Sequence, residues 1–336
     1  MELFAPLIWV EADRKPAKYL LNSLKIHTEL FPLTRKIIIT NQIYFNLYKN
    51  LNIDLVPIEK FQKNIYVKMF ESTDKVWTTT KKQLTYWKNT TKRFIYLYSY
   101  LYDSKLSKCV HLESDCVLID SRLINHLTTK QKSLIYFPKQ SNGVGCASIL
   151  IVNGASALEK FIKYINKNWK RVDITDMELL GRFANEQKYS EFMPAFVDKF
   201  REIEFVSDPV SVARYFLGND ARNFRLPFSK RGVEDKSVGS MDLRYFKIVQ
   251  SNTSSQLFLE NLITKSQKLL INVHIHSKRI PRNYNILTKM LLNESNKSRN
   301  IIWRLGRIDS RVMFERIISK LKRIFLPNKD SQVLFR

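Results

Sequence analysis

The chain has 336 residues, of which 44% are hydrophobic, so it can bury a substantial core as one large or two small domains. This composition excludes an intrinsically disordered chain. The 56 Lys and Arg residues outnumber the 31 Asp and Glu residues, and the formal net charge is +25. Such an excess of cations favours polyanionic partners, which include nucleic acid, anionic lipid headgroups and phosphorylated substrates.

Cysteine content and hydropathy indicate the compartment. Cys109, Cys116 and Cys146 form no C-x-x-C pair, so we expect neither a disulfide framework nor a zinc ribbon, and a reducing environment. The segment 1–10 carries Glu2 where a signal peptide has basic residues, and no stretch reaches the roughly 20 apolar residues of a membrane span. We therefore expect a cytoplasmic protein, either soluble or peripheral on a membrane.

The first third of the chain alternates short apolar runs with amphipathic segments. We expect strands at 7–10, 36–40 and 54–58, separated by helices at 16–25 and 42–49. This rhythm predicts a parallel sheet with right-handed crossovers, which is a common arrangement for binding a nucleotide. The fold class is therefore expected to be α/β.

The middle of the chain continues this pattern. An aromatic-rich segment at 79–102 has helical spacing, which favours aromatic side chains packed in the core over a base-stacking surface. Residues 108–120 predict a strand that a charged triplet interrupts. Further strands are expected at 133–137, 147–152 and 270–276, helices at 155–169 and 177–186, and long loops at 207–240 that close over a substrate.

The charged triplet contains two carboxylates, Glu113 and Asp115, within an apolar segment. Buried carboxylates are costly unless they are paired or bound to a metal, so we expect them at a strand end that faces a cleft. In an extended segment both side chains point to one side. Two such oxygen ligands suit Mg²⁺ or Mn²⁺ bridging a diphosphate, whereas the alternative is a solvated turn.

A second pair of candidate ligands lies near the end of the chain. His274 and His276 share one face of an expected strand, where an imidazole can complete the coordination shell of Mn²⁺. Lys278 and Arg279 follow and can neutralise phosphate oxygens. The alternative is a pair of exposed histidines on an edge strand.

Two further motifs have both a structural and a functional interpretation. Gly143 and Gly145 lack the third glycine of a dinucleotide fingerprint, which leaves an ordinary turn or a close backbone approach to a substrate. Asp176 and Glu178 follow Thr175 at the start of an expected helix. They are either acidic first-turn residues of a helix that Thr175 and Asp173 cap, or they present a carboxylate to the sugar or its acceptor.

In this order the segments resemble the GT-A glycosyltransferases, most closely the retaining transferases that include glycogenin and the bacterial lipopolysaccharide galactosyltransferases. A helix with Arg93 leads to HLESDCVLI, which is similar to the family's D-x-D strand with Glu113 in place of the first Asp. The segment NGVGCASILIVN resembles the family's N-S-G-V segment and the strand after it.

Two later motifs extend this resemblance, which covers residues 79–279. The segment 174–183 resembles D-Q-D-x-L-N-x-x-F, with Thr175 in place of the Gln. His274 or His276 with Lys278 resembles the family's late histidine and lysine, at a shorter spacing. The resemblance implies a Rossmann-like GT-A fold with a mixed central sheet flanked by helices.

The resemblance also implies an activity: metal-dependent transfer of a sugar from a nucleotide-diphosphate sugar to a glycan or lipid-linked glycan, with retention, in lipopolysaccharide or capsule synthesis. Asp115 would bind Mn²⁺ or Mg²⁺, Glu113 would contact the metal or the ribose, and His274 or His276 would add a ligand. Arg93, Lys278 and Arg279 would bind the diphosphate or the donor sugar. Asn142 and Asp176 would line the donor-sugar and acceptor site. In an inverting enzyme, Asp176 or Glu178 would act as the base.

The sequence divides into a catalytic domain at 1–290 and a basic tail at 291–336. In the tail, Arg316, Lys320 and Arg323 fall on one side of an expected helix. Its apolar stripe consists of Met313, Phe314, Ile317, Ile318, Leu321, Ile324 and Phe325. Such a helix either packs on its own domain or lies in an anionic headgroup layer, where we expect it at the inner face of the cell membrane.

Other classes of protein remain as alternatives. A basic nucleic-acid-binding protein or metal-dependent nuclease requires a contiguous basic groove, whereas the cations here are scattered and concentrated in the tail, so no nucleic-acid partner is expected. A nucleotidyltransferase also uses carboxylates and metal. It would need a Gly-Ser turn ahead of them, which His111 and Leu112 do not provide.

Overall fold

The computed structural model describes residues 5–13, 15–73, 81–129, 132–141, 143–170, 174–193, 204–209, 211–217, 245–275 and 278–297. The main sheet begins with four parallel strands in the order β3-β2-β1-β4. Their bounds are Leu7–Glu11 for β1, Lys36–Thr40 for β2, Asp54–Pro57 for β3 and Lys108–Leu112 for β4. The apolar runs LIWVE and KIIIT are buried throughout, as expected for parallel strands covered on both faces.

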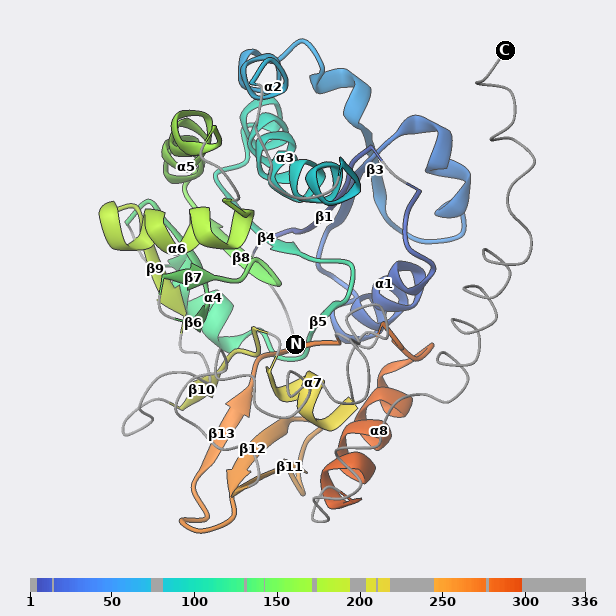
Figure 1. Cartoon of the computed structure of the whole chain (residues 1–336). Helices are drawn as coiled ribbons and strands as arrows, with labels where there is room; N and C mark the ends of the chain where they lie inside the picture. Colours follow the sequence, from blue (N-terminus) through green and yellow to red (C-terminus); the bar gives the residue numbers. More distant parts are fainter. Residues whose placement is uncertain are drawn as a thin grey trace, which may run out of the picture.

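The other half of the main sheet is mixed. Strand β8 (Ile149–Asn153) runs antiparallel to β4, and β6 (Leu134–Ser141) runs antiparallel to β8. Two short strands then flank β6: β7 (Val144–Gly145) is antiparallel to it and β9 (Ser190–Met193) is parallel. The structure therefore confirms the predicted α/β class and the mixed central sheet (Figure 1).

Helices cover both faces of the main sheet (Figure 1). On one face lie α2 (Ile65–Glu71), α3 (Lys81–Ser104), α5 (Ala155–Asn168) and α6 (Asp176–Glu186), and on the other α1 (Lys18–Leu30) and α4 (Arg122–Thr129). Alternate residues of β1 serve the two faces: Ile8 packs with the first group and Trp9 with the second. Phe94 and Leu101 of α3 are fully buried, so the predicted core role of this segment is confirmed.

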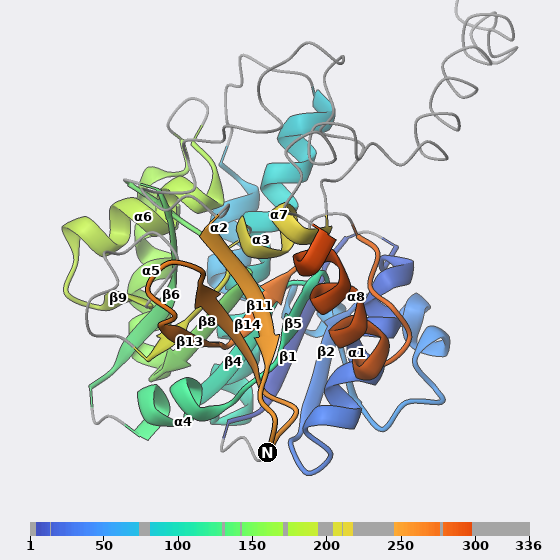
Figure 2. The same ribbon diagram turned by 90° about the horizontal axis from the view of Figure 1, so that it is seen from below.

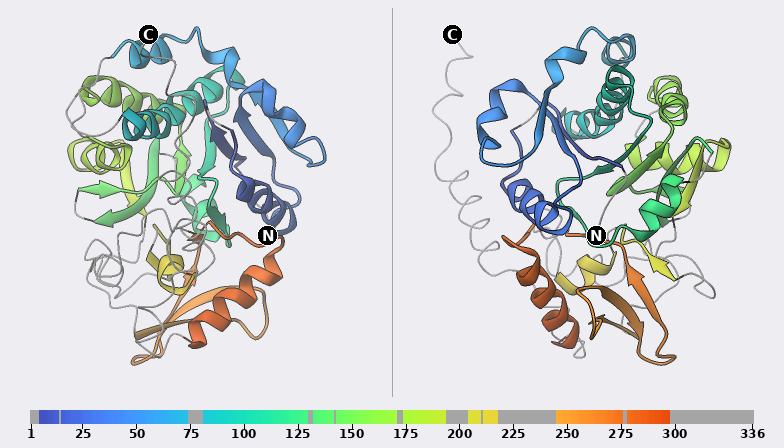
Figure 3. Two further views of the ribbon diagram at one scale, coloured as in Figure 1. Left: turned by 45° about the vertical axis from the view of Figure 1, so that its right-hand side comes forward. Right: turned by 180° about the vertical axis from the view of Figure 1, so that it is seen from behind.

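A smaller sheet lies beneath the main one (Figures 1 and 3). Its order is β10-β13-β12-β11, with bounds Phe205–Val206, Gln267–Leu270, Leu257–Asn261 and Phe246–Gln250. Helices α7 (Ser211–Leu217) and α8 (Tyr284–Lys297) pack with this sheet in a third apolar cluster (Figure 2). Helix α8 passes through residue 290, where the sequence suggested a domain boundary.

A third sheet has two strands: β5 (Cys116–Leu118) is antiparallel to β14 (Asn272–His274). The strand predicted at 108–120 is therefore two strands in different sheets, and the one predicted at 270–276 begins only after β13 has ended at Leu270. The chain must bend at both places so that it can pass from one sheet to the next.

Three other segments complete the comparison with the sequence. The helix predicted at 42–49 is a 3₁₀ helix, η1 (Gln42–Leu47), and a second, η2 (Ile58–Phe61), follows β3. The predicted loops at 207–240 contain α7. The basic amphipathic helix at 313–325 lies outside the described residues. Within the described ranges, no helix is both long and apolar enough to cross a membrane.

Candidate active site

The topology of the main sheet marks one edge as a binding site. Strands β2 and β3 lie on one side of β1, and β4 lies on the other. The strand order therefore reverses between β1 and β4, which is a topological switch point. Ligands of open α/β sheets bind outside the carboxyl ends of the strands at such a reversal. Glu113 follows the carboxyl end of β4 at this position, and Asp13 lies two residues beyond the end of β1.

Backbone hydrogen bonds fix the turn that follows β4. The Glu113 N–H donates to the Ser148 carbonyl at 3.0 Å, and the Cys116 N–H donates to the Glu113 carbonyl at 3.0 Å. Strand β5 then pairs with β14 in a register that sets Cys116 opposite His274. The Ile275 N–H donates to the Asp115 carbonyl at 2.8 Å. Strand pairing therefore brings His274 to the acidic turn.

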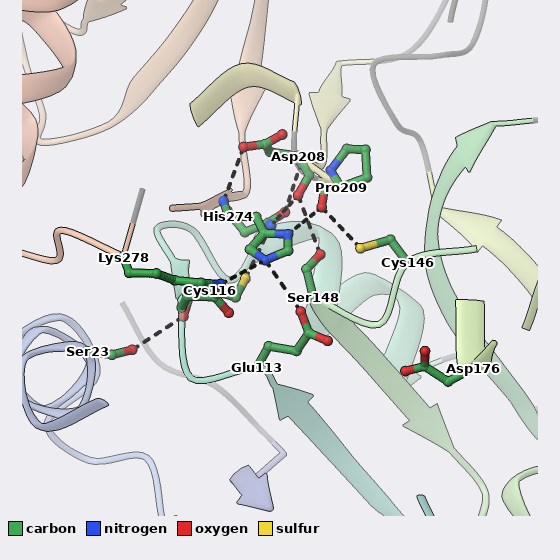
Figure 4. A network of polar contacts seen from close by, with 12 residues as sticks. Ser23, Glu113, Cys116, Cys146, Ser148, Asp176, Asp208, Pro209, His274 and Lys278 are labelled. Carbon is green, nitrogen blue, oxygen red and sulfur yellow. Dashed lines mark hydrogen bonds and ion pairs between the residues drawn. The ribbon is translucent and has the colours of Figure 1, made fainter. Parts of the chain in front are cut away.

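Three side chains converge at this turn. His274 Nε2 lies 3.2 Å from Asp115 Oδ2 and 3.4 Å from Glu113 Oε2. One ligand atom from each residue lies within 4.8 Å of the other two. The structure thus brings together Glu113, Asp115 and His274 in an arrangement that could hold a metal ion. Figure 4 shows two of them, Glu113 and His274.

Lys278 approaches the same cluster. Its Nζ forms an ion pair with Asp115 Oδ2, the oxygen that also faces His274. The Lys278 N–H donates to the Ile275 carbonyl at 2.9 Å, and its φ of 61° is uncommon for a residue other than glycine. Lys278 thus leaves this left-handed turn with its ammonium on Asp115, and Figure 4 shows its side chain extending toward the ring of His274. Arg279 is the next residue and is exposed.

Burial and charge shift the pKa values of this cluster. Burial alone would raise the pKa of Glu113, but the charges of Arg93, His274 and Lys278 lower it to about 2. Burial alone would lower the pKa of His274, but contact with Cys146 and the charge of Glu113 raise it well above its ordinary value. The cluster therefore keeps Glu113 as a carboxylate.

Arg93 of α3 joins the acidic turn to the start of α6. Its Nη1 donates to Glu113 Oε1 at 2.5 Å, and its Nη2 donates to Asp176 Oδ2 at 2.8 Å. Burial raises the pKa of Asp176 to about 6, an effect that Arg93 opposes. Asp176 Oδ1 is buried and has no hydrogen bond of good geometry among the described residues, although the nearby N–H groups of Asp176 and Met177 lower the pKa of the carboxyl. A buried acceptor of this kind suits a ligand donor.

Glu178, the second predicted carboxylate of α6, has different surroundings. The Glu178 side chain closes a capping box: it accepts the Thr175 N–H at 2.8 Å while Thr175 Oγ1 accepts the Glu178 N–H at 3.2 Å. The structure thus shows the capping alternative for Glu178. Asn142 and His276 lie outside the described residues.

The glycine turn packs directly on α6. A Cβ added at Gly181 would lie 2.2 Å from the Gly143 carbonyl oxygen, so only glycine allows this approach of α6 to the hairpin of β6 and β7. Gly143 itself has a φ of 72°. These glycines hold the hairpin beside the helix that begins at Asp176.

Two groups of residues near the site were not predicted. The Pro209 carbonyl accepts a hydrogen bond from His274 Nδ1 at 2.5 Å, and Asp208 Oδ2 accepts the His274 N–H at 3.1 Å. Near the end of β1, buried Lys92 forms ion pairs with Asp13 and Glu71. In the sequence, the only features that mark these residues are an Asp-Pro pair in an apolar context at 208–209 and a lysine beside Arg93.

This chain resembles known proteins in its structure, whereas comparisons of its sequence find no match. No family model matches the sequence, and no curated protein sequence matches it. A solved structure of the galactosyltransferase LgtC with donor and acceptor sugar analogues is 14% identical over 58% of this chain and 75% of LgtC, with a TM-score of 0.36. The bifunctional glycosyltransferase WbbM is 12% identical over 57% of this chain and 39% of its own, with a TM-score of 0.38.

A cytidylyltransferase from Leptospira borgpetersenii serovar Hardjo-bovis is also similar, at 11% identity over 56% of this chain and 80% of its own, with a TM-score of 0.29. Glycosyltransferases are thus among the solved structures that resemble this chain. These TM-scores all lie below 0.5, so we derive the function from the side chains of the site.

Proposed function

We propose that this chain is a metal-dependent glycosyltransferase that moves a sugar from a nucleotide-diphosphate sugar to a glycan or glycolipid acceptor. One observation carries the proposal: Glu113, Asp115 and His274 converge at the carboxyl end of β4, with Lys278 on the same carboxylate. This is where an α/β sheet of this topology binds a nucleotide.

The donor set of the cluster fits a divalent cation. Two carboxylates and one imidazole would supply three ligands, and diphosphate oxygens and water would complete the coordination of a bound cation. Carboxylate oxygens alone suit Mg²⁺, whereas an added imidazole favours Mn²⁺. We therefore propose Mn²⁺ as the preferred ion, held by Glu113, Asp115 and His274.

The chemistry to be catalysed is the departure of a nucleoside diphosphate. When bound, the cation neutralises the negative charge that develops on the leaving group. Lys278 extends its ammonium to the carboxylate that would hold the cation, so it lies within reach of phosphate oxygens at the same ion. Arg279 follows Lys278 and is proposed to add a second positive charge on that side.

Arg93 and Asp176 are proposed to form the sugar side of the site. The two Nη atoms of Arg93 already serve Glu113 and Asp176, so we propose that Arg93 fixes both carboxylates in place. Asp176 Oδ1 is a buried acceptor without a hydrogen bond of good geometry among the described residues, and a donor-sugar hydroxyl would satisfy it. Asn142 is proposed to belong to the same sugar site on the basis of its sequence motif.

The surroundings of the carboxylates support retention of anomeric configuration. An inverting transferase needs a carboxylate that can take a proton from the acceptor. The Asp176 side chain is only 2% exposed and is paired with Arg93, and Glu178 is held in its capping box. Because Asp176 is buried against Arg93 and Glu178 accepts the Thr175 N–H, neither carboxylate is placed to take that proton, and we propose the retaining outcome.

The wider role rests on the sequence. We propose that the acceptor belongs to a surface polysaccharide, such as lipopolysaccharide or capsule, and that residues 313–325 bring the enzyme to the inner face of the membrane. Arg316, Lys320 and Arg323 would contact anionic headgroups. Cosedimentation with vesicles that contain anionic lipid tests this: replacing these three residues with Glu should abolish binding, and unchanged binding would contradict it.

The activity itself is tested with a panel of nucleotide-diphosphate sugars and Mn²⁺, by measuring release of nucleoside diphosphate. We expect at least one donor to be turned over slowly by the wild type and not by Asp115→Asn. Asp54→Asn is the matched control, because Asp54 is an exposed carboxylate in β3 that pairs with Arg35. Its activity should equal that of the wild type.

Two results would contradict the proposal. One is release of pyrophosphate from nucleoside triphosphates with no turnover of any nucleotide-diphosphate sugar, which would indicate a nucleotidyltransferase. The other is equal turnover by the wild type and Asp115→Asn, which would remove the acidic turn from the active site.

A further inference from the structure

The segment Asp208–Pro209 lies beside the ring of His274, on the side away from Glu113 (Figure 4). It joins β10 to α7 and is buried. Four of its polar groups are used in hydrogen bonds to neighbouring segments, although the chain here forms no regular secondary structure. The segment is therefore held in a fixed position next to a candidate metal ligand.

The Pro209 carbonyl determines how the imidazole is oriented. A carbonyl can only accept, so the 2.5 Å contact requires a proton on His274 Nδ1. The other ring nitrogen, Nε2, then faces Asp115 and Glu113. Metal-binding histidines commonly donate their second ring nitrogen to a carbonyl in this way, which fixes both tautomer and ring orientation.

The Asp208 carboxylate accepts hydrogen bonds from the backbone of two segments, the start of α7 and β14. Oδ1 accepts the Val212 N–H at 2.9 Å, and Oδ2 accepts the Ala213 N–H at 2.9 Å and the His274 N–H at 3.1 Å. The residue is fully buried, at 0% exposure. A single carboxylate therefore ties the start of α7 to the strand that carries His274.

The main chain of Asp208 reinforces this link. Its N–H donates to Asn272 Oδ1 at 3.1 Å, and its carbonyl accepts Asn272 Nδ2 at 2.9 Å. Asn272 and His274 lie on the same face of β14, because side chains repeat every two residues along a strand. Asp208 is thus fastened to β14 at two neighbouring positions of that face.

We propose that Asp208 is a positioning residue for the cation site: by fixing the segment Asp208–Pro209 against β14, it aims His274 Nε2 at the space between Asp115 and Glu113. It does not bind the cation itself. The link to cation affinity rests on the proposed function, whereas the effect on the ring of His274 does not.

Asp120 supplies a matched control. It is also an aspartate at 0% exposure, and its Oδ1 accepts the Arg122 N–H at 2.9 Å near the start of α4. Its side-chain hydrogen bonds go to Arg122 rather than to β14. Asp120→Asn therefore imposes a comparable loss of a buried charge without touching the surroundings of His274.

Two measurements on the full chain test the proposal. Free Mn²⁺, measured by electron paramagnetic resonance, reports cation affinity: Asp208→Asn should weaken it about 10-fold or more, as expected for loss of a residue that orients a ligand. Solvent exchange of the His274 Nδ1 proton, measured by NMR without Mn²⁺, should be about 10-fold faster because its hydrogen bond is weakened. Asp120→Asn should change neither.

The outcomes separate this proposal from the proposed function. If Asp208→Asn has the circular dichroism spectrum of the wild type, unchanged Mn²⁺ affinity and slow exchange of the Nδ1 proton, positioning by Asp208 is wrong. If the wild type binds no Mn²⁺, the proposed function fails, and the exchange rate alone decides the role of Asp208. Should Asp208→Asn not fold, Asn272→Ala should accelerate exchange, and an unchanged rate in that variant overturns the proposal.

Discussion

His274 Nε2 lies 3.2 Å from Asp115 Oδ2, although 159 residues separate the two along the chain. The contact exists because β5 and β14 pair with Cys116 opposite His274, immediately after the turn that carries Glu113 and Asp115. Neither segment holds a cation site by itself. The site therefore depends on the junction between the main sheet and the smaller sheet beneath it.

The ion pairs of Arg93 should contribute strongly to stability. Arg93→Met would leave buried Asp176 without its cation and remove one of the cations near Glu113, and removal of one partner from a buried pair typically costs about 3–5 kcal/mol. We expect the free energy of unfolding, measured by urea denaturation, to fall by about this amount.

A double-mutant cycle isolates the Arg93–Asp176 contact. Asp176→Leu removes the carboxylate that Arg93 Nη2 contacts, so the double variant with Arg93→Met should be more stable than the sum of the two single losses implies. Strictly additive losses would show that the two side chains do not interact in solution.

His27 of α1 should make stability depend on pH. Its Nδ1 donates to the Ser23 carbonyl at 2.6 Å and its Nε2 accepts the Leu118 N–H at 3.0 Å, so the folded protein needs a neutral ring. Burial lowers the pKa of His27 to about 4, below the ordinary value of 6.5. Because the unfolded chain takes up this proton first, the stabilisation is complete above pH 6.5 and is lost as the pH falls toward 4.

The shift corresponds to a loss of about 3 kcal/mol between these limits. His27→Gln keeps a possible acceptor for Leu118 but does not titrate. The free energy of unfolding should therefore fall less between pH 7 and pH 4.5 in this variant than in the wild type, since all other groups are common to both. Parallel pH profiles for the two proteins would refute this role of His27.

Gly181 should be essential for the packing of the glycine hairpin. Gly181→Ala would bring Cβ to 2.2 Å from the Gly143 carbonyl oxygen, and because the clash is with backbone, the hairpin must move away from α6. Overpacking of this kind typically costs about 1–3 kcal/mol, which thermal denaturation would detect.

Gly143→Asn provides the comparison for Gly181→Ala. Gly143 has a φ of 72° and open space around it, and Asn tolerates this conformation better than most residues. We expect a cost of less than about 1 kcal/mol there. An equal or larger loss at position 143 would show that backbone strain, rather than the contact with α6, determines the stability of the hairpin.

The sequence was most informative where one local pattern leaves few alternatives. Apolar runs such as 7–10 and 36–40 require burial on both faces, which predicted β1 and β2 closely. The presence of Glu113 and Asp115 within an apolar segment predicted carboxylates at a strand end. These features depend on short-range periodicity, which a single sequence displays directly.

Features that depend on tertiary contacts could not be predicted in this way. The bend after Glu113 that sends 116–118 into another sheet depends on its pairing with β14. Asp208 became informative only when the structure placed it against His274, because its local sequence is that of an ordinary loop. For Glu178, capping and substrate binding have the same sequence signature, and only the contact with Thr175 distinguishes them.

The central claim is that Glu113, Asp115 and His274 together hold a divalent cation. Anomalous X-ray scattering from crystals grown with Mn²⁺ and a nucleoside diphosphate tests it most directly. We predict one strong manganese peak in contact with Asp115 and His274 Nε2, at ligand distances of roughly 2.0–2.3 Å. A saturated crystal with its manganese peak elsewhere, or with none between these side chains, would contradict the account.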